Sequence, residues 1–170
     1  MILGLNREGM KMTIWIVVAD TARARFFRVE KQQAPERTLV QKPMHPESSE
    51  VLVEIEDLFH PESRLHDSEL ASDAPGMSSV AGMHSKFGMD EKVSPKEEEG
   101  IRFAKELAQT LKAQSRQFDR LYLIAPPHFL GLLRPDLDKA VVSKIVLEID
   151  KELSNHSVED IRAHLPEHLG

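Results

Sequence analysis

The strongest constraint on the fold is a short uncharged stretch, Leu121–Ala125, which is followed directly by two prolines. An apolar run this short, with charge before it and proline after it, is typical of a strand buried on both faces. Pro126 and Pro127 end the strand, because proline cannot donate a hydrogen bond to a sheet. The apolar segment 129–133 then predicts a short helix. Together these elements predict half of an α/β unit, in which ligands tend to bind beyond the carboxyl end of the strand.

The amino-terminal half predicts three further strands. Thr13–Asp20 is rich in β-branched residues and predicts a second buried strand. Segment 22–30 alternates between two faces and follows closely, which favours an antiparallel neighbour. Segment 51–58 predicts a half-exposed edge strand, with Glu54 and Glu56 on the face opposite its valines and isoleucine. An amphipathic helix is the main alternative for this last segment.

The carboxyl-terminal half predicts alternating helices and strands. Ser94 and the Pro-Lys-Glu that follows it form a strong helix start, and an amphipathic helix should run from there to about Ser115. A helix is predicted at 135–143, a strand at 145–150 and a final helix at 158–165. The whole pattern predicts an α/β fold, a mixed β-sheet of about five strands covered by helices.

The chain length predicts a single domain with one long insertion. We expect residues 1–11 to be a disordered leader, with Met12 as an alternative start, and residues 12–170 to be the domain. Residues 60–94 show no sustained period and should form a long loop before the central helix, and an ordered element of its own is the alternative for this segment.

Composition excludes several classes of function. The chain has no cysteine, so disulfides, thiol catalysis and cysteine-ligated metals are excluded. Its formal net charge of −6 argues against a general nucleic-acid binder, although a local basic patch remains compatible with it. No apolar run is long enough for a membrane helix and no signal peptide is recognised, so we expect a cytoplasmic protein without a membrane partner. The histidines lack metal-ligand spacing, and we predict no metal and no cofactor.

Four residues are candidates for catalysis in a small hydrolase with its site at the strand ends. Asp20 follows the first buried strand and could act as an acid, although a turn-forming role is the alternative. His128 and Arg134 flank the short helix after Leu121–Ala125. Asp73 lies in the long loop, within a turn-forming Asp-Ala-Pro-Gly sequence.

Cations near the strand ends, with residues of the long loop, are candidates for binding an anion or a macromolecule. Arg134 and Lys151 could receive an anion such as phosphate, and pairing with a nearby carboxylate is the alternative for each. The full set of predicted binding residues is Arg23, Arg25, Gly76, His84, Lys86, Arg134 and Lys151.

Several segments together resemble the bacterial host attachment protein family, also described as bacterial/archaeal release-factor-like proteins. These segments are TIWIVVADTARARFFRV, DSELASDAPG, GIRFAKELAQTL, FDRLYLIAPPHFLGLLR and EIDKELSN. The resemblance covers about Met12 to Leu165. It implies a fold like the central domain of eukaryotic-type class I release factors and of Pelota.

In release factors this domain carries a Gly-Gly-Gln loop before a helix, and segment 76–95 looks equivalent to that loop. The triplet is absent from this chain, so peptidyl-tRNA hydrolysis is not expected. The first hypothesis is therefore a non-catalytic cytoplasmic interaction protein, acting at the ribosome or on RNA through this loop and the cations at the strand ends. The hydrolase is the second, and a factor required for attachment to host cells is the third. A homo-oligomer is also among the partners that we consider.

Overall fold

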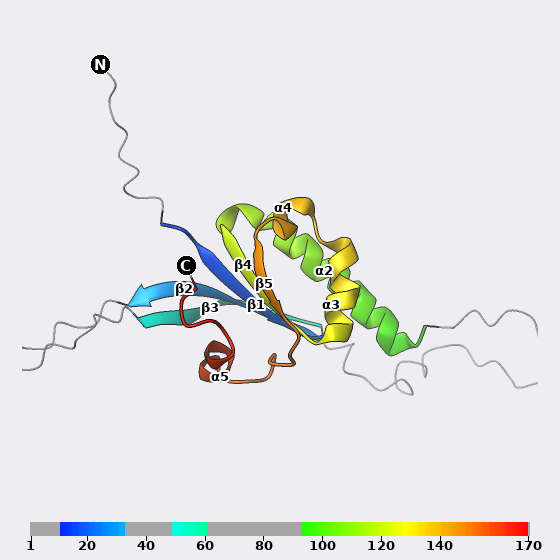
Figure 1. The fold of residues 1–170 in the computed structure, drawn as a ribbon. Helices are drawn as coiled ribbons and strands as arrows, with labels where there is room; N and C mark the ends of the chain where they lie inside the picture. Colours follow the sequence, from blue (N-terminus) through cyan, green and yellow to red (C-terminus); the bar gives the residue numbers. More distant parts are fainter. Residues whose placement is uncertain (1–10, 33–48, 61–92, 170) are drawn as a thin grey trace, which may run out of the picture.

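A computed structural model describes residues 11–32, 49–60 and 93–169 of the chain (Figure 1). Residues 1–10 of the expected leader and most of the expected loop at 60–94 lie outside these residues. Four of the predicted site residues lie outside them as well: Asp73, Gly76, His84 and Lys86.

The described residues form one five-stranded sheet with the strand order β3-β2-β1-β4-β5. Strands β1, β2 and β3 pair antiparallel, whereas β4 is parallel to β1 and β5 is parallel to β4. The strands are Ile14–Ala19, Arg23–Gln32, Ser49–Phe59, Arg120–Ile124 and Ile145–Ile149 for β1 to β5. The predicted mixed sheet of five strands is confirmed, and the segment around residue 55 is an edge strand instead of a helix.

Helices cover both faces of this sheet (Figure 1). Helices α2 (Pro95–Ala113), α3 (Pro127–Leu133) and α4 (Lys139–Val142) lie on one face, and α5 (Val158–Ala163) lies on the other. Helix α2 begins as predicted, because the Ser94 hydroxyl accepts a hydrogen bond from the Glu97 amide at 3.3 Å.

The predicted continuous helix over 135–143 is wrong. A single 3-10 turn occupies Arg134–Asp136, Leu137 is extended, and α4 begins only at Lys139. The interruption has a local cause, because the Asp138 carboxylate accepts a hydrogen bond from the Ala140 amide and caps a new helix. The final helix is likewise shorter than predicted and ends at Ala163.

A β-bulge corrects the prediction for β3. The register between β2 and β3 shifts between Phe26 and Phe27, and Ile55 has no partner in β2. The side chains of Glu54 and Glu56 therefore lie on opposite faces of the sheet. Glu54 binds Arg25, whereas Glu56 accepts a hydrogen bond from Gln114 at the end of α2. A strict period of two could not predict this change of face.

The core has two layers, one on each side of the sheet. Phe26 packs with the α2 layer and its neighbour Phe27 with the α5 layer, as the predicted alternation of β2 requires. Both rings are fully buried, and burial of a side chain of this size stabilises the fold by about 1.5–3 kcal/mol. The carboxyl-terminal segment completes the α5 layer, and the Tyr122 hydroxyl donates to the Leu169 carbonyl at 3.0 Å.

Candidate functional site at the carboxyl edge of the sheet

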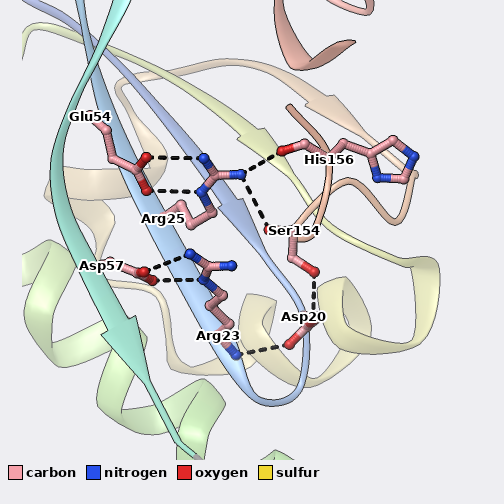
Figure 2. Close-up of polar contacts among 7 residues, drawn as sticks. All are labelled: Asp20, Arg23, Arg25, Glu54, Asp57, Ser154 and His156. Atoms are coloured by element: carbon pink, nitrogen blue, oxygen red, sulfur yellow. Dashed lines mark hydrogen bonds and ion pairs between the residues drawn. The ribbon is translucent and has the colours of Figure 1, made fainter. Parts of the chain in front are cut away.

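Asp20 lies at the carboxyl end of β1, where sequence analysis predicted a site. Its Oδ1 accepts hydrogen bonds from the amides of Ala22 at 2.6 Å and Arg23 at 2.8 Å, and this closes the turn into β2. Its Oδ2 lies 2.5 Å from the Ser154 hydroxyl (Figure 2). That hydroxyl also lies 2.5 Å from Oε1 of Glu152, so the two carboxylates share its single hydrogen. Both carboxylate oxygens are therefore engaged. The turn-forming role, which was the alternative for this residue, describes the geometry that is observed.

Arg25 carries a buried charge in the middle of this region, with only 7% of its surface exposed. Its guanidinium group forms two parallel hydrogen bonds to Glu54, at 2.8 and 3.0 Å. On its other side it donates to the backbone carbonyls of Ser154 at 3.3 Å and His156 at 2.7 Å (Figure 2). The group also lies 5.0 Å from the centre of the Phe27 ring. Arg25 thus joins β2, β3 and the segment before α5.

Arg23 forms a second pair of parallel hydrogen bonds beside the first. Its Nε and Nη2 donate to the two carboxylate oxygens of Asp57 at 2.9 and 2.6 Å (Figure 2). The hydrogen bond from Arg23 lowers the pKa of the Asp57 carboxyl group, and the same bond raises the pKa of Arg23. Both guanidinium groups at this edge already have a carboxylate partner, so an anion could bind only by displacing it.

Arg134 and Lys151 differ in their ion pairing. Arg134 donates to the Glu148 carboxylate in β5, which raises the pKa of Arg134. This is the carboxylate pairing that was the alternative to anion binding. Lys151 is exposed after the end of β5 and forms no ion pair with any described residue.

His128 lies in a different part of the same edge. It lines a pocket of about 220 Å³ between the start of α2 and α3, together with Thr21, Ser94, Lys96, Glu97, Gly100 and Leu132. Asp20 is not among the lining residues, and its carboxylate is held by the turn. The structure therefore does not join the predicted acid and the predicted histidine in one site.

The described residues carry no group of three or more His, Asp or Glu side chains placed to hold a metal ion. Among the helices that the structure describes, none has the length and apolar character needed to cross a bilayer.

Several partners in this region were not predicted as site residues. Glu54 and Asp57 lie on β3, the strand paired with β2, and acidic residues on a strand next to the arginines of β2 were a signal that could have predicted the ion pairs. Ser154 and His156 contribute through backbone carbonyls, which leave no trace in side-chain chemistry.

The fold and this edge define an α/β domain whose polar residues at the carboxyl ends of the strands are largely bonded to one another. Comparison with known families shows the family to which the chain belongs. Residues 15–165 match the family described as "protein required for attachment to host cells", and the chain belongs to that family.

Comparison with individual proteins adds little. No curated protein matches the chain. Among solved structures, the Ppx/GppA phosphatase of Aquifex aeolicus, in its type II variant crystal structure, is similar at 10% sequence identity and a TM-score of 0.30. The match covers 81% of this chain and 35% of that one, so the chain spans about a third of the solved protein. A TM-score this low supports no conclusion about fold or activity.

We predict that Arg25→Ala lowers the free energy of unfolding by about 2–4 kcal/mol, because it leaves Glu54 and two carbonyls without their donor. Arg23→Ala is the matched control and should cost at most about 1 kcal/mol, since the Arg23–Asp57 pair is more exposed. Urea unfolding followed by circular dichroism measures both. Equal losses for the two variants would contradict the assignment of Arg25 as the buried junction.

We predict a pH-dependent difference between wild type and Asp57→Asn. The lowered pKa of Asp57 means that its ion pair stabilises the fold above the ordinary value of 3.8, and that this stability is lost as the pH falls through the lower pKa of the folded state. The difference should be at most about 1 kcal/mol at neutral pH, because the Asp57 side chain is 41% exposed. Urea unfolding at a series of pH values should show it shrink below pH 3.8. A difference independent of pH would refute the ion pair.

Proposed function

We propose that this chain is a non-catalytic interaction protein that contributes to attachment to host cells. One observation carries the proposal: Asp20, Arg23 and Arg25, three of the polar residues predicted for catalysis or binding at the carboxyl edge, hold the fold together. Asp20 closes a turn and docks Ser154, and Arg25 and Arg23 are paired with carboxylates. The family's description supports the contribution to attachment.

The proposed partner is RNA, free or within the ribosome, in the cytoplasm. The resemblance to release-factor central domains suggests this partner. A cytoplasmic factor can be required for attachment without being an adhesin itself. It can act on the synthesis of the proteins that bind the host. The loop at 76–94, through which sequence analysis placed this contact, lies mostly outside the described residues, so support must come from elsewhere on the surface.

That support comes from four cations at the amino ends of β1 and β4, which we call the amino-edge cations: Lys11, Lys31, Arg116 and Arg120. All four are exposed, and none forms an ion pair with a described residue. Lys11 and Lys31 line one pocket with Met12, and Arg120 pairs in register with Ile14 of the same pocket. These contacts bring together Lys11 just before β1, Lys31 on β2 and Arg120 on β4. Arg116 lies in the short turn before β4.

This arrangement supports binding to a nucleic-acid backbone. Adjacent strands lie about 4.8 Å apart, so the cations can meet successive groups of one extended polyanion. The arginines at the carboxyl edge are neutralised by carboxylates, whereas these four charges are available. A net charge of −6 over the whole chain is compatible with the surface because its charges are unevenly distributed.

We predict that the full chain binds a single-stranded oligoribonucleotide and purified ribosomes in a strongly salt-dependent manner. Four phosphate contacts should give a slope of about −3 for the logarithm of the binding constant against the logarithm of salt concentration. Arg116→Glu with Arg120→Glu should weaken binding at least about tenfold at low salt, because two contacts become repulsive. Fluorescence anisotropy measures binding to the oligoribonucleotide, and co-sedimentation measures binding to the ribosomes.

The matched control is Lys96→Glu with Lys105→Glu, which makes the same change of net charge on α2. This double variant should bind the oligoribonucleotide and the ribosomes with nearly the affinity of wild type. An equal loss for both double variants would show that only net charge matters, and would contradict an interface at the amino edge.

We further predict that deletion of the gene reduces attachment of the producing cell to its host, and that the wild-type gene restores it. The variant His128→Ala should restore attachment equally well, because His128 is proposed to have no catalytic role. Counting attached cells with each variant tests this. Failure of His128→Ala at normal protein levels would favour the small hydrolase, whose site would then be the pocket beside Ser94 and Lys96.

A further inference from the structure

Strand β5 is an edge strand whose middle carries no charge. It pairs with β4 on one side, and no described strand pairs with its other side. Val146 is 49% exposed and Leu147 is 39% exposed, and nearby Val142 in α4 is 50% exposed. These are three of the seven large hydrophobic side chains that are exposed in the described part of the chain. An uncharged apolar edge is a template for pairing with another strand.

The opposite edge of the sheet differs. Strand β3 also exposes apolar side chains, Ile55 and Phe59, but acidic residues lie between them. One of these, Asp57, is held in an ion pair with β2, as is Glu54 just before Ile55. Both edge strands carry a bulge, but charge on an edge strand discourages pairing with another chain, and β3 has the more charge in its middle. The β5 edge is therefore the better of the two for an interface.

The segment made of Lys144, in the turn before β5, and the first four residues of β5 is complementary to itself when it is reversed. The five residues Lys144 to Glu148 read Lys-Ile-Val-Leu-Glu. In an antiparallel pair of two copies centred on Val146, each lysine faces a glutamate, each Ile145 faces a Leu147, and Val146 faces itself. We propose that β5 pairs in this register with β5 of a second copy of the chain, which joins two five-stranded sheets across a two-fold axis.

The charged ends of this segment remain able to meet. Lys144 Nζ donates to the carbonyls of Ser115 and Phe118, which uses two of its three hydrogens. The hydrogen bonds from Arg134 to Glu148 both end on Oε2, so Oε1 is left for a donor from the second copy. Unlike charges therefore stand at both ends of the proposed pair.

Val146 has no partner inside its own sheet. The register between β4 and β5 passes from Leu121 with Ile145 to Tyr122 with Leu147, so Val146 is the extra residue of a bulge. Its exposed side chain lies at the centre of the proposed pair. The contact is small for a protein interface, so we expect a dissociation constant of roughly micromolar order.

The absence of cysteine from the chain allows a direct test of the register. In Val146→Cys, opposed residues of the two copies would have Cα atoms about 4.5–5.5 Å apart, which suits a disulfide. Mild oxidation of the full chain that carries Val146→Cys should give a covalent dimer at the micromolar concentrations at which two copies are expected to associate. Leu147→Cys should cross-link poorly, because Leu147 faces Ile145 in this register. Ile55→Cys on β3 is the matched control and should stay monomeric.

Wild type provides the second measurement. Sedimentation velocity should show a mass that rises from 19.3 kDa toward twice that value with increasing concentration. Val146→Lys should abolish this rise, because two like charges would face each other, while Ile55→Lys should not. A wild-type chain that stays monomeric at hundreds of micromolar would overturn the proposal and leave the bulge as a device that protects the edge. Cross-linking through Leu147→Cys and not Val146→Cys would overturn the proposed register.

Discussion

The buried guanidinium group of Arg25 is the interaction on which this structure most depends. A positive charge that is almost fully removed from water is tolerated only when its donors are satisfied. Arg25 satisfies this requirement with three segments that are far apart in the chain: its own strand β2, Glu54 of β3, and the backbone around Ser154. The carboxyl-terminal segment is thus fixed against the sheet by a charge, in addition to the apolar contacts of α5.

This requirement explains why the carboxyl edge of the sheet is a poor place for chemistry in this chain. The end of a β-sheet in an α/β protein is the usual position of a ligand site. Here Asp20 and Ser154 bind each other, and Arg23 and Asp57 form a closed pair beside them. Groups that stabilise the fold in this way are not available to a substrate, which favours an interaction protein. Among the described residues, four exposed cations without an ion pair lie at the opposite, amino edge.

Much of the fold could be predicted from local patterns. The Pro-Pro pair after Leu121–Ala125, the cap at Ser94 and the alternation of β2 act through neighbouring residues, and the structure confirms each. The bulge at Ile55 could not be predicted, because it depends on how β3 meets β2 across many residues. The break before Lys139 was missed for a different reason, since the cap by Asp138 competes with a continuous apolar pattern.

The site was harder to predict than the fold. Sequence analysis placed Arg23, Arg25 and Arg134 near strand ends but did not assign the carboxylates that neutralise them, because which carboxylate each arginine meets depends on the register between strands. The central claim is that the polar groups of the carboxyl edge hold the fold together. A double-mutant cycle of Arg25→Met and Glu54→Gln, measured by urea unfolding, tests it most directly. The account predicts a coupling free energy of about 1–3 kcal/mol, and a coupling near zero would contradict it.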